Sequence, residues 1–506
     1  MSSSRSPLPR PDSSVLQSFR GDARVSAALH PLETTLLIIS GALLCFMPWA
    51  LGTMHVWSQW ISLGLASAAF TVAIINRRYR GELAPQGDFR LVMWPKLIRF
   101  PLFSLGLVLL GYILTQALNP AWVYMSDGKY RWLEPVAHIS WLPSGMDTPF
   151  ADMNAWRVLV IYSTAWLLTC ALWVGVTRRV TVQWLLTAIA VNGALLAIIG
   201  ILQKVTSSPY ILWVLKEANT AGYFFATIIY KNHAGAYLNL AMMLCVALLY
   251  WHFARAERRM ERASPAPVFA FAAIVIGLGV LLSNSRGAIL LLLLFTLIAF
   301  IGFIVRCSLY RGEGRSPWTI VMLCAIFALF IGLGSYFLNT GKAFDRISKL
   351  IDEGRTDSSV ITRNFAREAT FDMARDNLVT GWGAGSFRHY FPVYQRHYSE
   401  IYDVTWNKDT KLRWEYAHND YVQLLAELGL IGAGIIAAML GCGVRHLVRH
   451  RVWQRPHLMF ILLALVITAL HGWVDFQFHN PAILILWCAS AALVGRWAEL
   501  EARMAR

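Results

Sequence analysis

The sequence has few charged residues for its length. Of its 506 residues, only 15% are Asp, Glu, Lys or Arg, whereas 57% are hydrophobic, and this balance excludes an ordinary soluble domain. Cysteine is also scarce, and the seven cysteines all fall within or beside apolar segments, so we expect neither a disulfide framework nor a CxxC metal site. The chain is therefore expected to be an integral membrane protein.

Motifs for nucleotide-dependent chemistry are missing. The sequence has no GxxxxGK[ST] phosphate loop, no credible dinucleotide fingerprint and no DxD pair for a metal-bound sugar nucleotide. Residues 1–33 lack the short apolar core and small-residue cleavage site of a signal peptide, so we expect no cleaved signal. A reaction on the outer face of a membrane would have no ATP, so its substrate would have to arrive already activated.

Apolar runs of about 20 residues recur along the chain, the length that a helix needs to cross the hydrocarbon core of a bilayer. They predict an all-α polytopic membrane protein with about twelve transmembrane helices. The expected spans are 34–53, 57–76, 99–118, 156–176, 181–203, 233–252, 266–282, 287–305, 318–338, 421–443, 457–473 and 480–497.

Lys and Arg cluster in alternate loops, which is the positive-inside pattern and places both termini in the cytoplasm. The net charge of +16 is thus first a topology signal, with contact to anionic lipids a secondary consequence. The domains expected are a cytoplasmic tail (1–33), helices one to nine (34–338), a large periplasmic loop (339–420), helices ten to twelve (421–497) and a cytoplasmic tail (498–506).

The loop 339–420 is expected to be partly helical. It holds as many acidic as basic residues, and loops of this length translocate largely regardless of charge. Within it, "DSSVITRNFAREATFDMARDN" has the spacing of an amphipathic helix that starts at Asp357 or Ser358. "GWGAGSF" predicts a glycine-rich turn, and "SFRHYFPVYQRHYSEIYDVTW" predicts an aromatic-rich helix.

Four separated segments bring polar side chains to the outer face: "YKNHAG", "SNSRGA", the loop that ends at His418, and "HGWVDFQFHNP". Asp420 and Gln423 have the spacing of a capping box, so a helix is expected to begin at Tyr421 with His418 just above it. The positive end of that helix opposes protonation of the imidazole, which could then accept a proton. The alternative is an interfacial histidine that binds a lipid headgroup or its own loop.

The other candidates also have structural alternatives. Arg286 suits bidentate phosphate binding but could be a snorkelling anchor, and Arg363 could be a solvated charge on the loop helix. Asp475, with His471 and His479, matches no standard metal spacing, so we expect it to orient an acceptor hydroxyl or to pair with an arginine. Lys231, His233 and Glu427 are weaker candidates.

Together these segments resemble the O-antigen ligase and polymerase superfamily, bacterial inner-membrane glycosyltransferases of the GT-C type. The resemblance covers roughly residues 220–480. It rests on "RNFAREATFDMARDNLVTGWGAGSF" followed by "AHNDYVQLLAELGLIG", with "YKNHAGAYL", "SNSRGAIL" and "HGWVDFQFHNP" as supporting segments.

The resemblance implies a catalytic role for His418, pyrophosphate contacts from Arg286 and Arg363, and a supporting role for Asp475. Arg367 stands where relatives often have Trp, so the choice between Arg363 and Arg367 stays open. Other supporting residues expected at the site are Lys231, Asn419 and His471.

The activity implied is inverting, metal-independent transfer of a glycan from undecaprenyl pyrophosphate to an acceptor hydroxyl at the periplasmic face, without a cofactor. The acceptor could be lipid A-core, a growing repeat-unit polysaccharide or a protein hydroxyl, and no nucleic acid is expected as a partner. From another class, twelve spans could form a lipid-linked glycan transporter, which would place polar residues at mid-membrane. Asn192 and Asn239 are the few such residues here.

Overall fold

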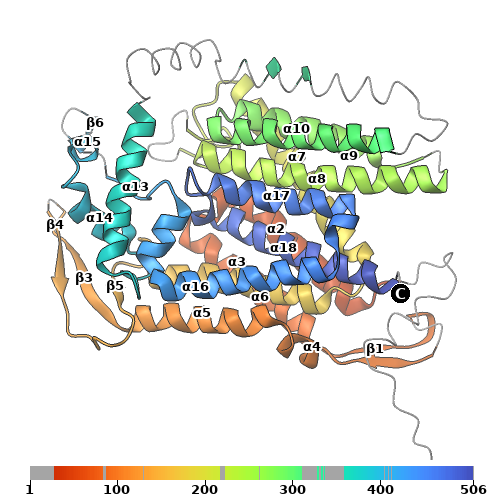
Figure 1. Cartoon of the computed structure of the whole chain (residues 1–506), viewed down its shortest axis with the longest axis horizontal. Coiled ribbons are helices and arrows are strands. Elements are labelled where there is room, and N and C mark those ends of the chain that lie inside the picture. Colours follow the sequence, from red (N-terminus) through yellow and green to blue (C-terminus); the bar gives the residue numbers. More distant parts are fainter. Residues whose placement is uncertain are drawn as a thin grey trace, which may run out of the picture.

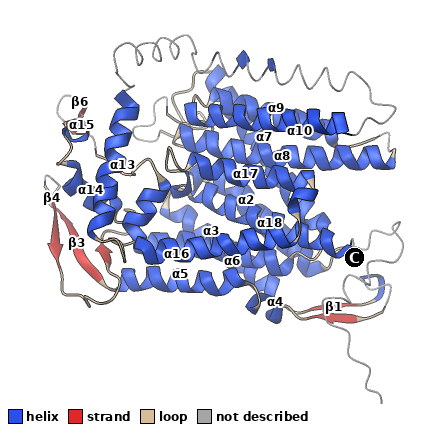
Figure 2. Cartoon of the chain, in the orientation of Figure 1, coloured by secondary structure: helices blue, strands red, loops and turns tan. Residues whose placement is uncertain are grey.

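The computed structural model of the chain describes residues 28–83, 87–128, 130–216, 223–260, 263–309, 358–403, 405–407, 410–411 and 413–504, with 328–329, 332–333 and 336. Helices dominate these residues (Figure 2). They are Pro31–Trp49 (α2), Val56–Ile74 (α3), Trp94–Ile98 (α4), Pro101–Leu118 (α5), Ala155–Gly175 (α6), Arg179–Val205 (α7), Lys231–Arg259 (α8), Ala266–Leu282 (α9), Arg286–Leu309 (α10), Ser358–Asp376 (α13), Phe387–Gln395 (α14), Ser399–Tyr402 (α15), Asp420–Arg449 (α16), Pro456–His471 (α17) and Pro481–Met504 (α18).

The chain is a helical polytopic membrane protein. Among the described residues, eight helices are long and apolar enough to cross a membrane: α2, α3, α5, α6, α7, α8, α16 and α18. Three shorter apolar helices, Ala266–Leu282, Arg286–Gly302 and Pro456–His471, lie at further expected spans. The expected span 318–338 falls almost entirely outside the described residues, so the count of twelve stays a prediction.

The local sequence explains where several of these helices begin. Proline is the first residue of α2, α5, α17 and α18, at Pro31, Pro101, Pro456 and Pro481. Proline is well suited to this position because its missing N–H would have no partner within the helix and its fixed φ is already helical. The long helices lie side by side in Figure 1. α8 is the most buried candidate span, whereas α5 and α16 are the least buried.

Short strands make the chain less purely helical than expected. They are Arg77–Tyr79 (β1), Phe89–Leu91 (β2), Pro120–Ser126 (β3), Arg131–Pro135 (β4), Gly145–Asp147 (β5), Thr405–Asn407 (β6) and Thr410–Lys411 (β7). β3 pairs antiparallel with β4 and parallel with β5. This three-stranded sheet follows α5, and its presence corrects the expectation of an all-α chain.

A second hydrophobic core lies outside the long helices. The sheet and the loop helices α13 to α15 gather at one end of the molecule, where α13 lies across the ends of the long helices (Figure 1). Met146 on β5 packs in one cluster with Met373 on α13, Phe387 and Phe391 on α14, and Trp414. The amphipathic loop helix is present as α13, but the expected aromatic-rich helix is two short helices, α14 and α15. This core holds α13 and the segment before His418 against each other.

Candidate active site

His418 ends the loop that leads into α16 and has an unusual backbone conformation. Its φ of 51° lies in the left-handed region, which is costly for a residue with a side chain. The next residue, Asn419, caps the helix, because its Oδ1 accepts hydrogen bonds of 3.0 Å from the backbone N–H groups of Tyr421 and Val422. The expected capping box with Asp420 as the cap is therefore wrong by one residue, and α16 begins at Asp420.

The Asn419 side chain is fully used within the protein. Besides capping α16, its amide Nδ2 donates to the carbonyl of Trp473 at 2.9 Å. Asn419 is also 1% exposed, so the structure assigns it to holding the loop around His418 in place. The supporting role expected for Asn419 at the site stays a prediction.

Asp475 is the hydrogen-bond partner of His418. Its Oδ1 lies 3.0 Å from His418 Nδ1, and its Oδ2 accepts from Asn232 Nδ2 at 2.5 Å. The backbone N–H of Phe476 also donates to Oδ1 at 3.0 Å. A carboxylate that accepts from Nδ1–H leaves the lone pair of the imidazole on Nε2. The pair therefore has the arrangement of a histidine base oriented by a buried acid.

The charge state of Asp475 follows from its neighbours. Burial alone would raise its pKa, but the hydrogen bond and charge of His418 and the charge of Arg363 outweigh burial. The pKa of Asp475 is therefore well below the ordinary value, and the group stays a carboxylate at neutral pH. The sequence predicts an acceptor hydroxyl or an arginine as its partner; in the structure its hydrogen-bond partner is His418, and the charge of Arg363 also acts on it.

One cationic side chain, Arg363 on α13, lies beside this pair: it hydrogen-bonds the hydroxyl of Tyr230, and its charge acts on Asp475. The charges of Arg286, Lys204 and Arg363 act, in that order of strength, on Lys231, the first residue of α8. Segments far apart in the sequence thus bring several cations within electrostatic range of Lys231. Cations held near one another repel, and a bound anion would relieve this repulsion. This cationic cluster is therefore suited to binding an anion such as a phosphate.

Arg367 differs from Arg363 in its surroundings. It lies one turn further along α13 and is not among the leading electrostatic influences on Asp475, Tyr230 or Lys231, whereas Arg363 is. Of the two arginines that the sequence left open, Arg363 is thus the one that the structure places beside the His418–Asp475 pair.

Close helix packing brings Arg286 to this place. A side chain at Gly235 of α8 would meet Ala288 of α10 at 2.5 Å, so only glycine allows the two helices to approach this closely. Asn239 of α8 adds a hydrogen bond of 2.8 Å to the carbonyl of Ala288. At the start of α10, Gly287 lies against the ring of buried His471, so His471 lines the junction between α10 and α17.

The mid-membrane asparagines have structural partners. Asn192 accepts a hydrogen bond of 2.7 Å from the indole N–H of Trp49, which links α7 to α2, and Asn239 links α8 to α10. These contacts are the ordinary use of a polar side chain between helices. They do not favour the transporter alternative.

A second histidine–carboxylate pair lies nearby and was not recognised in the sequence. His479 Nδ1 is 2.7 Å from Asp420 Oδ1, while Asp420 Oδ2 accepts from the backbone N–H of Phe478 at 3.0 Å. Burial would lower the pKa of His479, but the hydrogen bond to Asp420 and its charge raise it above the ordinary value. The second histidine of "HGWVDFQFHNP", His479, is the signal for this pair in the sequence, although its spacing from Asp475 suggests only a possible metal ligand.

The ring of Phe476 contacts aromatic residues around both pairs. It stacks on Tyr416 and on Tyr230, with ring centroids 4.3 Å and 5.2 Å apart, and it forms a T-shaped contact with the His418 ring at 4.9 Å. His233 hydrogen-bonds the carbonyl of Phe476 at 3.1 Å. His233 therefore helps to hold Phe476 in place. Within the described part of the chain, no group of three or more His, Cys, Asp or Glu side chains has the arrangement of a metal site.

Glu427 supports the glycine-rich turn. Its carboxylate accepts from the backbone N–H groups of Gly385 at 2.8 Å and Phe387 at 3.3 Å. Two residues later α16 is interrupted at Gly429, whose φ of 63° and ψ of −170° are not helical. Val379 lies directly against this break, because its carbonyl oxygen would be 2.4 Å from a Cβ at Gly429. Glu427 therefore fixes the loop to α16.

Part of the chain matches a known protein family. The O-antigen ligase family matches residues 271–437, which run from α9 through α13 and α14 into α16 and include Arg286, Arg363 and His418. None of the curated proteins is similar enough to the chain to count as a match. The family match confirms the resemblance to the O-antigen ligase and polymerase superfamily that the motifs indicated.

Proposed function

Because residues 271–437 carry the O-antigen ligase domain, we propose that this protein is a glycosyltransferase of the O-antigen ligase type. It transfers a glycan from undecaprenyl pyrophosphate to an acceptor hydroxyl, with inversion at the anomeric carbon. The reaction takes place on the periplasmic face of the bacterial inner membrane, and both termini are cytoplasmic. The lipid-linked glycan supplies the activated bond, which fits the lack of nucleotide-binding motifs in the sequence.

His418 is the proposed base. The acceptor hydroxyl oxygen attacks the anomeric carbon and forms the new glycosidic bond, while its proton passes to Nε2 of His418. Asp475 holds the imidazole in the tautomer that leaves Nε2 free to accept, and it stabilises the imidazolium that results. Asn232 in turn orients Asp475 through its 2.5 Å hydrogen bond. These residues come from α8, the segment before α16, and the segment between α17 and α18.

Arg286, Arg363 and Lys231 are the proposed binding groups for the leaving group. When the bond between the anomeric carbon and the phosphate oxygen breaks, its electron pair leaves on the pyrophosphate, and nearby fixed cations stabilise this charge. α8 begins at Lys231 and α10 begins at Arg286, so the positive ends of two helices add to the same field. No metal ion takes part in this scheme.

The observation that carries the proposal is the position of the cationic cluster beside a histidine–carboxylate pair. Arg363 links the two, because it reaches the Tyr230 hydroxyl and acts on Asp475. Asn232 also connects them, since its Nδ2 donates to Asp475 and lies 2.7 Å from the Tyr230 hydroxyl. A diphosphate in the cluster and an acceptor hydroxyl at His418 would thus be held by one hydrogen-bonded network.

The proposal is tested with the purified full chain, an undecaprenyl-pyrophosphate-linked glycan, and three acceptors offered separately: lipid A-core, a glycan repeat unit and a protein substrate. Transfer to any one of them, with an inverted anomeric configuration in the product, supports a glycosyltransferase and identifies its class. Binding of the donor without transfer to any acceptor, combined with movement of the donor across vesicle membranes, would instead indicate a transporter. Retention of configuration would contradict the single-displacement scheme.

A further inference from the structure

A large cavity lies apart from the cationic cluster. It has a volume of about 2180 Å³ and is bordered by α5, α6, α16 and α18. This is roughly twice the upper end of the volume of small-molecule pockets, about 300–1,000 Å³. Neither His418 nor any of Lys231, Arg286 and Arg363 lines it. The groups proposed to bind the pyrophosphate are therefore not part of this cavity.

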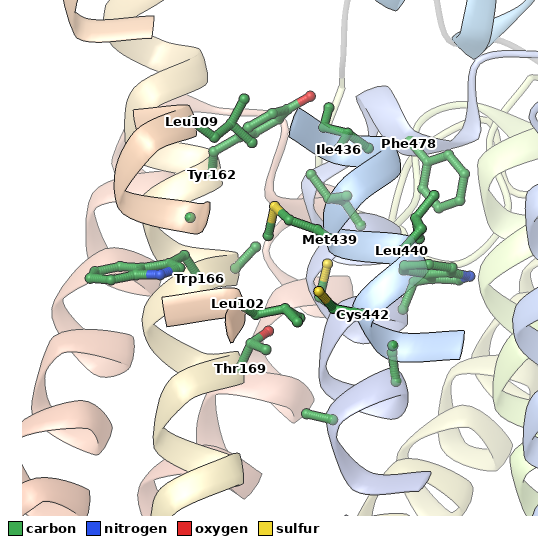
Figure 3. Close-up of a pocket in the computed structure, with 18 of the residues that line it drawn as sticks. Leu102, Leu109, Tyr162, Trp166, Thr169, Ile436, Met439, Leu440, Cys442 and Phe478 are labelled. Carbon is green, nitrogen blue, oxygen red and sulfur yellow. The ribbon is translucent and has the colours of Figure 1, made fainter. Parts of the chain in front are cut away.

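The middle of the cavity is apolar. Figure 3 shows Leu102 and Trp166 on one side of it and Met439 and Cys442 on the other. Leu440 also lines the cavity and is 50% exposed, so this wall reaches the surface of a helix that the lipid bilayer surrounds. Hydrocarbon chains are the matching ligand for such a wall in a membrane.

The end of the cavity far from His418 is strongly basic. α16 runs for 30 residues from Asp420, beside His418, to Arg449, a length of about 45 Å at 1.5 Å per residue. Arg445 and Arg449 line the cavity at the end of this helix, and Arg99 lines it just before α5. All three arginines are exposed. This end is therefore at the opposite membrane surface from His418.

Acidic side chains do not neutralise this basic end. Among the described residues that line it, Glu499 is the one acid, and it already forms ion pairs with Arg496 at 2.5 Å and with Arg503. Lys96 also lines this end, and its Nζ donates to the carbonyl of Val174 at 2.8 Å. Basic pockets between transmembrane helices suit the phosphate of anionic lipids.

We propose that an anionic phospholipid of the surrounding membrane occupies this cavity. Its phosphate lies among Arg99, Arg445 and Arg449, and its acyl chains extend along the apolar middle beside Trp166 and Leu440. The site is a lipid-binding site in the leaflet opposite the proposed active site. It does not depend on the glycosyltransferase proposal, because none of its headgroup-binding residues belongs to the proposed catalytic machinery.

The test is native mass spectrometry of the purified full chain, titrated with phosphatidylglycerol or with phosphatidylcholine of the same acyl chains. The wild type is expected to bind phosphatidylglycerol in preference. The double variant Arg445→Gln and Arg449→Gln is expected to bind phosphatidylglycerol about 10- to 30-fold more weakly, since each surface cation contributes about 1 kcal/mol. A control with Arg90→Gln and Arg258→Gln, two exposed arginines outside the cavity, removes the same charge and is expected to bind like the wild type.

A second variant tests the place of the acyl chains. Leu440→Trp puts a larger side chain at the partly exposed wall without altering charge, and it is expected to weaken phosphatidylglycerol binding several-fold. Unchanged binding in this variant would place the lipid outside the cavity and overturn the proposal. Equal binding of phosphatidylcholine by the wild type, unchanged binding by the double Arg variant, or displacement of phosphatidylglycerol by equimolar undecaprenyl phosphate would overturn it as well.

Discussion

Nδ1 of His418 lies 3.0 Å from a carboxylate oxygen of Asp475, although 57 positions separate the two residues. The contact joins the loop before α16 to the segment between α17 and α18. It fixes one tautomer of the imidazole and places a buried negative charge behind it. The effects expected on catalysis and on unfolding when Asp475 is replaced both depend on this contact.

The first prediction concerns Asp475. Asp475→Asn keeps the size of the side chain but removes its charge and can present an N–H to His418, which favours the wrong tautomer. The rate constant kcat for glycan transfer is expected to fall roughly 10²- to 10⁴-fold while the KM for the lipid-linked donor changes much less. Steady-state kinetics on the purified variant check this, with circular dichroism as a control for folding. A large rise in donor KM with unchanged kcat would show that Asp475 serves donor binding instead.

The second prediction compares two arginines on the same helix. Arg363→Gln removes a cation from beside Asp475 and Tyr230, and donor affinity is expected to fall roughly 10- to 100-fold, as for loss of a hydrogen bond to a charged group. Arg367→Gln, one turn away, is the matched control and is expected to have little effect. Donor binding is measured with a radiolabelled lipid-linked glycan. A larger effect at Arg367 than at Arg363 would reverse the assignment.

The long apolar helices could be predicted from sequence because a membrane span is a local property of about 20 residues. The start of α13 at Ser358 was also predictable, since Asp357 and Ser358 precede an amphipathic pattern. The sheet was not predicted. Its strands are short, and Met146 of β5 packs against α13 and α14, more than 200 residues further along the chain. Contacts of this kind leave no periodic signal.

The site was predictable in its residue types but not in its pairings. The sequence predicted that His418, Arg286 and Asp475 lie on the same face of the membrane, but it predicted a different partner for Asp475. It also predicted Asp420 as the cap of α16, because aspartate and asparagine are equally good capping residues. In the structure, the left-handed backbone at His418 makes Asn419 the cap and leaves Asp420 to bind His479. Such choices depend on tertiary contacts.

The third prediction concerns pH and stability. The folded-state pKa of Asp475 is depressed, so the group contributes stability at pH values above its unfolded pKa, about 3.9, and loses it as pH falls through the folded value. The difference in unfolding temperature between the wild type and Asp475→Asn is therefore expected to shrink as the pH falls below about 4. Thermal unfolding in detergent between about pH 7 and pH 2 provides the measurement. A difference that grows as the pH falls below about 4 would contradict the assigned charge state.

The fourth prediction concerns the interruption of α16. A Cβ at Gly429 would lie 2.4 Å from the carbonyl oxygen of Val379, and the residue has a left-handed φ. Gly429→Ala is therefore expected to destabilise the protein by at least about 2 kcal/mol and to lower its unfolding temperature. Gly434→Ala is the control on the same helix, where a Cβ meets nothing within 4 Å, and its stability is expected to stay equal or rise. Equal effects at the two positions would argue against the tight junction at Gly429.

The central claim is that His418 removes the proton from the acceptor while the nearby cations bind the leaving pyrophosphate. The most direct measurement is the single-turnover rate constant for glycan transfer at saturating donor and acceptor, compared between the wild type and His418→Ala. We expect a loss of roughly 10²- to 10⁴-fold in the rate constant, with the dissociation constant for the donor nearly unchanged. A folded His418→Ala protein that transfers glycan at the wild-type rate would contradict the account.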